Sequence, residues 1–145
     1  MKVVLQRVRS ASVSVDGSIS GSIGPGYLLL VGLAVGDDEN TVRRLAADVG
    51  KARLMSDVQG KMGVNLRDAG GQALAVSQFT LLADFSKGNR PSFNGAAKPE
   101  IAKPLFELFV RELSVLLGSP VPTGVFGADM RVELVNDGPV TVVLE

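Results

Sequence analysis

The sequence of 145 residues contains neither histidine nor cysteine, and these two absences exclude whole classes of chemistry. Without histidine the chain cannot build a Ser-His-Asp triad, and without cysteine it cannot build a thiol protease or a thiol redox centre. Zinc sites made from Cys and His are excluded for the same reason. We therefore predict no metal site and no cofactor.

The sequence also lacks an excess of either charge, because 15 Lys and Arg balance 15 Asp and Glu. Their distribution is uneven. Residues 1–103 carry 13 basic and 9 acidic side chains, and residues 104–145 carry 2 and 6. A neutral chain has no global field that attracts nucleic acid, but this distribution leaves room for a local basic surface that contacts RNA.

A long uninterrupted apolar run is absent as well. Arg7 and Arg9 interrupt the start of the chain, where a signal peptide needs an apolar core. The longest uncharged span, residues 17–36, contains six glycines and Pro25, which do not suit a helix in a bilayer. We predict no membrane association and a cytoplasmic location.

With 46% apolar residues, the chain has enough material for a packed core, and its length indicates one domain over residues 1–145. Alternating or continuous apolar runs predict strands over 3–15, 18–23, 27–35, 73–82, 130–134 and 140–144. Helical spacing of apolar residues predicts helices over 39–52 and 99–117. The expected fold class is α+β, with a mostly antiparallel, barrel-like sheet and two main helices.

Gln78 and Thr80 lie two residues apart in the predicted strand 73–82, so their side chains project from one face. Their attachment points are then about 6.6 Å apart, and an amide beside a hydroxyl can hold an ester carbonyl. A polar strand face without chemistry is the alternative. Thr80 needs a base to become a nucleophile, and Asp84 lies about 13 Å further along an extended chain. The residues favour positioning of a substrate over proton transfer.

Gly138-Pro139 is the second candidate site, although a simple hairpin turn explains the same residues. Glycine lacks a Cβ, so its carbonyl can approach a ligand closely. An X-Pro bond can also be cis, which would give a rigid pair of outward-pointing carbonyls. Two such acceptors suit the ammonium group of a substrate.

Basic residues suggest two further contacts. The loop Lys87-Gly88-Asn89-Arg90, followed by Phe93, can contact phosphate and stack on a base, or it is a solvated loop. Arg7 lies among apolar residues of the first strand, where a guanidinium needs a carboxylate or carbonyl partner. A structural ion pair is the alternative role for Arg7.

Several short motifs occur in the order and spacing of one family. They are Gln6-Arg7-Val8, Gly60-Lys61-Met62, Ser77-Gln78-Phe79-Thr80-Leu81, Arg90-Pro91-Ser92-Phe93, Ala128-Asp129-Met130 and Asn136-Asp137-Gly138-Pro139-Val140-Thr141. Over essentially its full length the chain resembles the D-aminoacyl-tRNA deacylases, once called D-tyrosyl-tRNA deacylases.

The resemblance implies a homodimer whose active site lies at the subunit interface. One wall would consist of Ser77, Gln78, Phe79 and Thr80, and the partner subunit would supply Gly138 and Pro139. The Gly-Pro carbonyls would receive the α-ammonium group, so that an L side chain collides with the protein. Arg7 resembles the residue that holds this element in place.

The function implied by the resemblance is hydrolysis of the ester bond of D-aminoacyl-tRNA, a proofreading step in translation quality control. Glycyl-tRNA, which is achiral, would be hydrolysed as well. The terminal ribose 2′-hydroxyl would assist, since no base for Thr80 is evident. Arg90 and Phe93 would bind the tRNA, and DNA is not an expected partner. The alternatives are a non-catalytic dimeric RNA- or ligand-binding module and a hydrolase of small D-amino-acid esters.

Overall fold

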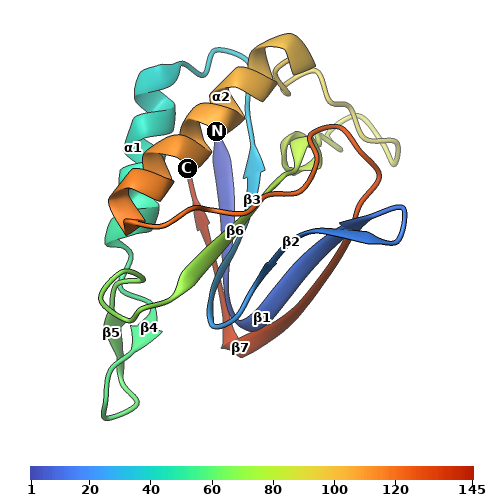
Figure 1. Cartoon of the computed structure of the whole chain (residues 1–145). Helices are drawn as coiled ribbons and strands as arrows, with labels where there is room; N and C mark the ends of the chain where they lie inside the picture. Colours follow the sequence, from blue (N-terminus) through green and yellow to red (C-terminus); the bar gives the residue numbers. More distant parts are fainter.

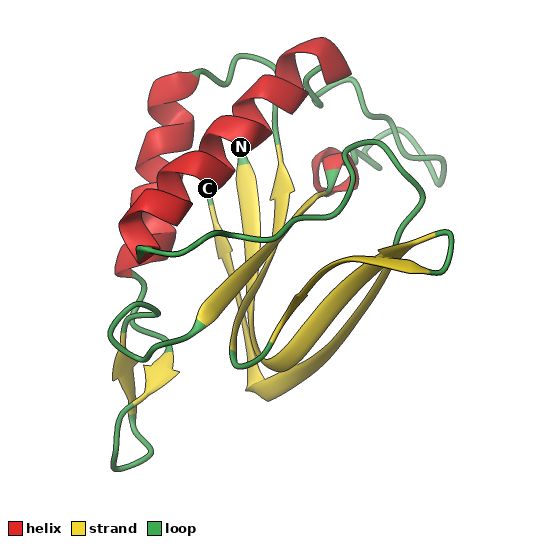
Figure 2. Ribbon diagram, viewed as in Figure 1, coloured by secondary structure: helices red, strands yellow, loops and turns green.

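A curled sheet with two helices on one face forms the protein, whose computed structural model describes all 145 residues (Figures 1 and 2). The sheet contains β1 (Lys2–Val15), β2 (Ser18–Ile23), β3 (Gly26–Gly32), β6 (Gln72–Ser77) and β7 (Arg131–Leu144). The helices are α1 (Glu39–Lys51) and α2 (Pro99–Leu117). A separate hairpin consists of β4 (Met55–Ser56) and β5 (Met62–Val64). Neither helix combines the length and apolar character that a membrane span requires.

The long strand β1 organises the sheet. Its first half pairs with β3, its second half pairs with β2, and β7 runs antiparallel along its other edge. Only the pairing of β3 with β6 is parallel. The expected α+β class, with two helices and a mostly antiparallel, partly barrel-like sheet, is therefore confirmed.

The core has two parts, one on each face of the sheet. The larger cluster of 20 buried residues lies between the sheet and the helices, and the smaller cluster of 7 lies on the other face. Consecutive residues of β3 contribute to both parts, since Tyr27 and Leu29 belong to the larger cluster and Leu28 to the smaller. Burial on both faces agrees with the continuous apolar run in this strand.

Three predicted element boundaries are wrong. The strand expected over 27–35 ends at Gly32, and the strand expected over 73–82 ends at Ser77 and continues as the short 3₁₀ helix η1 (Phe79–Leu82). The strands expected over 130–134 and 140–144 are one strand, β7. Apolar content cannot separate these states, because a short apolar run suits a strand, a 3₁₀ turn or a strand with an insertion equally well.

Candidate active site

Ser77 and Gln78 mark the point at which β6 changes into η1. The Gln78 amide still donates to the Val31 carbonyl at 2.8 Å, which extends the pairing with β3 by one residue. The chain then turns, and the Leu81 amide donates to the Gln78 carbonyl at 3.2 Å. Because of this turn, the extended spacing of about 6.6 Å expected between Gln78 and Thr80 does not apply.

The turn nevertheless brings the two side chains together. The Gln78 side-chain amide donates a hydrogen bond to the Thr80 hydroxyl, and Thr80 is exposed to solvent. No carboxylate forms a hydrogen bond with either side chain. An amide cannot remove a proton from Thr80, so the arrangement supplies a polar pair that can position a substrate and supplies no general base.

Gly32 is a positioning residue that the sequence analysis missed. A Cβ at this position would lie 2.7 Å from Leu82 Cδ2 and 2.9 Å from the Gln78 carbonyl oxygen. The absence of a side chain at Gly32 therefore allows η1 to pack directly on the end of β3. The only signal in the sequence was a glycine inside the predicted strand 27–35, where it can mark a close backbone approach.

An apolar pocket of about 560 Å³ opens beside η1. Its 17 lining residues, 12 of them hydrophobic, come from the ends of β3 and β6, from the segment before α2, and from residues 126–132. Ser77, Gln78, Phe79 and Phe93 are among them. The rings of Phe79 and Phe93 meet edge to face, with centroids 5.0 Å apart. A concave apolar space with a few polar groups is typical of a small-ligand site.

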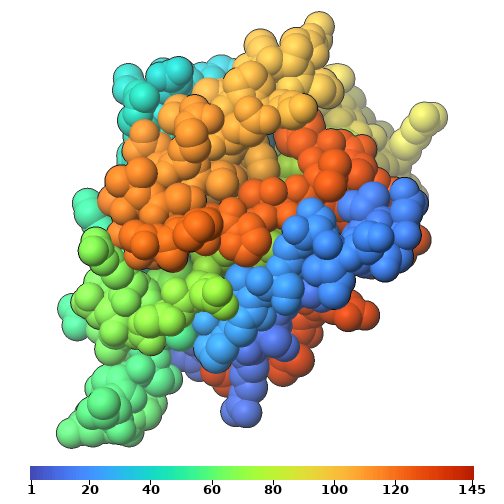
Figure 3. Space-filling view, in the orientation of Figure 1, coloured from blue at the N-terminus to red at the C-terminus, as the bar shows by residue number.

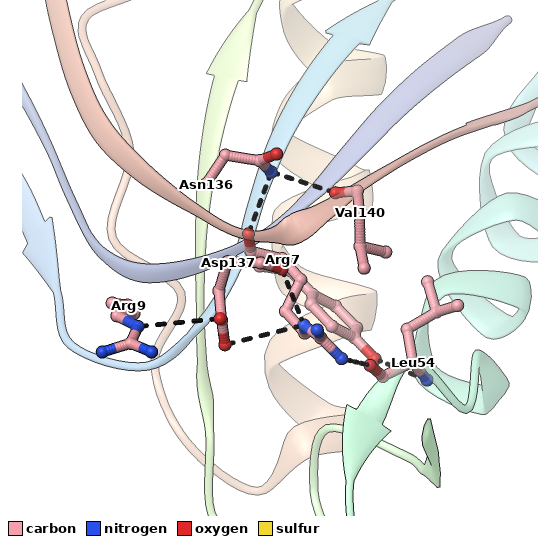
Figure 4. A network of polar contacts seen from close by, with 7 residues as sticks. Arg7, Arg9, Leu54, Asn136, Asp137 and Val140 are labelled. Atoms are coloured by element: carbon pink, nitrogen blue, oxygen red, sulfur yellow. Dashed lines mark hydrogen bonds and ion pairs between the residues drawn. The ribbon is translucent and has the colours of Figure 1, made fainter. Parts of the chain in front are cut away.

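Arg7 forms the centre of a second polar cluster, shown in Figure 4. Its side chain is only 11% exposed, its Nε donates to the Asp137 carbonyl at 3.0 Å, and its Nη1 donates to the Leu54 carbonyl at 2.8 Å. The Asp137 carboxylate lies further away, 3.7 Å from Nε. The partly buried guanidinium therefore has carbonyl partners, as the sequence analysis expected, and these bonds hold β7 beside residue 54.

The Gly138-Pro139 segment is an insertion within β7 rather than a hairpin turn. On β1 the pairing moves from Gln6 to Val8, while on β7 it moves from Thr141 to Asn136, so β7 has extra residues here. The Asn136 side chain bridges the insertion by donating to the Arg7 carbonyl at 3.1 Å and to the Val140 carbonyl at 3.0 Å. The Gly138-Pro139 peptide bond is cis.

Gly138 also has a conformation that favours glycine, with φ at +138°. A Cβ would meet the Val140 side chain at 2.7 Å and Arg7 Nη2 at 3.2 Å. Both Gly138 and Pro139 are exposed. The backbone of the insertion is therefore exposed to solvent, while Arg7 and Asn136 hold the insertion by hydrogen bonds.

The two candidate walls do not meet within one chain. Arg7, which holds the insertion, pairs with Tyr27, and Tyr27 pairs with Ala73, four residues before Ser77. The insertion is therefore about 13 Å from the end of β6 along the strand direction. Within one chain, the two candidate walls therefore lie apart.

Tyr27 links the larger core to the Arg7 cluster. Its hydroxyl donates to the Ala52 carbonyl and accepts from the Leu54 amide, both at 3.2 Å. Burial raises the pKa of Tyr27 above its ordinary value of 10.0, and the Leu54 amide and the charge of Arg7 offset part of this rise. The hydroxyl therefore stays neutral and fixes the segment that receives the Arg7 hydrogen bond.

Arg90 lies outside the pocket, in the exposed loop between η1 and Phe93. No carboxylate lies within 4.0 Å of its guanidinium, nor of the Lys87 ammonium group. These cations are free to contact an anionic ligand. Arg90 and Phe93 are therefore close in the chain, but only Phe93 lines the pocket.

The fold and the pocket together define an α+β protein with an apolar ligand site at the end of a parallel strand pair. A model of the D-Tyr-tRNA(Tyr) deacylase family matches residues 4–145. The chain belongs to this family, as its motifs predicted, and the expectation of an enzyme of the deacylase class is confirmed by this membership.

Two curated relatives are similar over the full chain. The D-aminoacyl-tRNA deacylase of Dechloromonas aromatica is 55% identical over 145 residues, covering 100% of this chain and 97% of the relative. The D-aminoacyl-tRNA deacylase of Chromobacterium violaceum is 56% identical with the same coverage.

Two solved structures share the fold. One is described as the c-Myc DNA Unwinding Element Binding Protein, is 36% identical, and has a TM-score of 0.93 over 100% of this chain and 98% of that one. The other, described as a probable eukaryotic D-amino acid tRNA deacylase, has a TM-score of 0.84 over 99% of this chain and 97% of that one. At 16% identity the second likeness supports the fold alone.

Proposed function

We propose that this protein hydrolyses the ester bond of D-aminoacyl-tRNA in the cytoplasm and releases free D-amino acid and tRNA, which removes D-amino acids before translation uses them. The observation that carries the proposal is the Gln78–Thr80 pair at the edge of an apolar pocket. It occurs in a chain 55% identical to a D-aminoacyl-tRNA deacylase over its whole length.

The pocket suits the terminal nucleoside of the tRNA. Phe79 and Phe93 offer aromatic surfaces on which an unpaired base can stack. The Gln78 amide and the Thr80 hydroxyl then lie where they can orient the ester carbonyl. Arg90, which has no carboxylate partner, contacts a phosphate group of the RNA.

Discrimination against L-amino acids depends on Gly138 and Pro139 of the partner subunit. The α-ammonium group binds to their carbonyl oxygens, and an L side chain then collides with the protein. Side-chain affinity alone discriminates by about 1–3 kcal/mol per methylene, whereas a steric wall rejects a whole class of substrates. Glycine has no side chain to exclude, so glycyl-tRNA is hydrolysed as well.

The chemistry relies on the substrate's own 2′-hydroxyl. A water molecule adds to the ester carbonyl carbon, the bond to the 3′ oxygen breaks, and that oxygen takes up a proton. The neighbouring 2′-hydroxyl assists this transfer. The inventory of groups around Thr80 supports this route, since its hydrogen-bond partner is an amide and not a base.

A homodimer is part of the proposal. The strand β7 is paired on one side only, by β1, and its outer residues Val135 and Val143 are 52% and 56% exposed. A long unpaired edge with exposed apolar side chains favours association with a second copy. The separation of Ser77 from Gly138 within one chain supports the same conclusion.

Release of free amino acid from D-tyrosyl-tRNA and L-tyrosyl-tRNA, measured side by side, tests the proposal. We expect rapid release of D-tyrosine and retention of the L-ester. Equal hydrolysis of a simple D-tyrosine ester would instead indicate a general esterase. A second candidate, a nucleic-acid-binding module, rests on the 36% identical DNA unwinding element binding protein. Binding of tRNA without release of D-tyrosine would favour it.

A further inference from the structure

Residues 84–92, here called the tongue, form a projection with a fixed base. The Asp84 and Ser92 backbones exchange two hydrogen bonds, each 2.8 Å long. The Asp84 carboxylate accepts from the Ser86 amide at 2.8 Å, and this bond lowers the pKa of Asp84. The Gly88 amide closes a turn on the Phe85 carbonyl at 3.2 Å. The tongue is therefore ordered by its own hydrogen bonds.

The tongue stands beside the mouth of the apolar pocket. The chain enters it from η1, whose Phe79 lines the pocket, and leaves it at Phe93, which lines the pocket too. The tip of the tongue does not line the pocket. In Figures 1 and 3 the yellow-green segment after η1 extends away from the body of the molecule at the upper right.

The side chains at the tip combine one exposed aromatic ring with two free cations. Phe85 is 59% exposed, and Lys87 and Arg90 are exposed with no carboxylate within 4.0 Å. An aromatic ring beside unpaired cations is the combination that binds single-stranded nucleic acid, because bases stack on the ring while phosphates contact the cations. A duplex backbone would use the cations and leave Phe85 without a partner.

We propose that the tongue binds the unpaired nucleotides that precede the terminal, aminoacylated nucleotide of the substrate. Phe85 stacks on one of their bases, and Lys87 and Arg90 contact their phosphates. The terminal nucleotide occupies the pocket that Phe79 and Phe93 line, so the next nucleotides leave the mouth beside the tongue. This inference rests on the proposed function, since it assumes an RNA whose 3′ end enters the pocket.

Binding of a short RNA tests the tongue independently of catalysis. The probe is a single-stranded RNA ending in CCA, labelled at its 5′ end and followed by fluorescence anisotropy. Stacking contributes about 1–3 kcal/mol per base, so Phe85→Ala should weaken binding by about 5- to 150-fold. Val58→Ala is the matched control, because Val58 is fully exposed on the distant β4–β5 hairpin and should not alter affinity.

The salt dependence of the same binding tests the two cations. The double variant Lys87→Ala/Arg90→Ala should reduce the slope of log affinity against log salt by about 1.4, because each phosphate that the protein neutralises on a single strand contributes about 0.7. Lys61→Ala, on the β4–β5 hairpin, should leave the slope unchanged. A blunt RNA hairpin without unpaired 3′ nucleotides should bind more weakly than the single strand.

Hydrolysis separates a failure of this inference from a failure of the proposed function. Phe85→Ala should lower kcat/KM for D-tyrosyl-tRNA at least about fivefold more than for D-tyrosyl-adenosine, which has no further nucleotides. Wild-type protein that releases D-tyrosine from neither substrate would refute the proposed function. Normal hydrolysis by wild type, together with unchanged RNA affinity and unchanged kcat/KM in Phe85→Ala, would refute the tongue alone. Equal binding of the blunt hairpin would also refute it.

Discussion

Individual side chains around the candidate site hold neighbouring segments of the backbone in place. Arg7 donates to backbone carbonyls on two different segments, and Asn136 bridges the two ends of the Gly138 insertion. The Gln78 side-chain amide likewise fixes the Thr80 hydroxyl by a hydrogen bond. A chain without histidine thus relies on amide and guanidinium donors, which keep a fixed protonation state across the physiological range.

Thr80→Ala is expected to retain appreciable deacylation of D-tyrosyl-tRNA, because the hydroxyl positions the substrate and has no base that would make it a nucleophile. Loss of a true nucleophile costs several powers of ten. The measurement is single-turnover release of D-tyrosine, with tRNA ending in 2′-deoxyadenosine as the comparison. An inactive Thr80→Ala variant, together with normal hydrolysis of the deoxy substrate by wild type, would refute ribose assistance.

Tyr27→Phe should destabilise the protein by about 1–3 kcal/mol, since the Leu54 amide and the Ala52 carbonyl lose their partner. The folded-state pKa of Tyr27 is raised above 10.0, so its contribution is complete below that pH and is lost as pH rises towards the folded pKa. The difference in free energy of unfolding between wild type and variant should therefore shrink above pH 10.0.

Tyrosinate absorbance provides the control for that prediction, because Tyr27 is the chain's single tyrosine and tryptophan is absent. The native protein should ionise at higher pH than the same chain in denaturant. An identical titration in both states would contradict a neutral, buried hydroxyl.

At the scale of the element, the position of η1 depends on its contact with the end of β3. Gly32→Ala should displace η1, because the added methyl group would lie 2.9 Å from the Gln78 carbonyl oxygen and 2.7 Å from Leu82. We expect about a tenfold or larger loss of kcat/KM, in line with the sensitivity of catalysis to a misplaced group. Gly63→Ala is the control, since a Cβ there meets nothing within 4 Å.

That comparison also separates positioning from general destabilisation. Thermal unfolding of both glycine variants should be measured beside activity. If Gly32→Ala keeps full activity at a temperature where it is folded, the contact does not position the Gln78–Thr80 pair.

Sequence patterns predicted most elements because burial produces simple periodicities. The apolar run in β3 and the helical spacing in α1 depend only on which faces are covered. The end of β6 and the insertion in β7 depend on contacts between distant segments. Gly32 admits η1, and Asn136 of β7 binds the Arg7 carbonyl of β1. Such contacts between distant segments leave no local signal in the sequence. The predicted end of the strand that stops at Ser77 and the suggested hairpin turn at Gly138 were therefore wrong.

At the scale of the whole molecule, the two candidate walls lie in different places on the sheet. The pocket lies at the end of the β3–β6 pair and is also lined by Val132 at the start of β7, whereas the Gly138 insertion lies further along β7. Both walls could be predicted from motifs, since each is a local string of residues. Their separation within one chain follows only from the strand register. The proposed dimer would make activity depend on residues of both subunits, and mixing two variants tests this.

Two inactive variants should complement each other when mixed. Ala96→Trp fills the pocket, which Ala96 lines, and Gly138→Ala distorts the insertion at a positive φ. In a mixed dimer, the intact pocket of the Gly138→Ala subunit meets the intact insertion of the Ala96→Trp subunit. Random exchange makes about half of the dimers mixed, each with one intact site of two, so about a quarter of wild-type activity should return.

The measurement is D-tyrosine release after co-refolding of the two variants at equal concentration, with each variant refolded alone as the control. Circular dichroism of each variant verifies that it folds. Sedimentation should show dimers for wild type and for the mixture. A fully active monomer, or a mixture no more active than the sum of its parts while mixed dimers are present, would mean that Ser77–Thr80 and Gly138-Pro139 do not act on one substrate from two subunits.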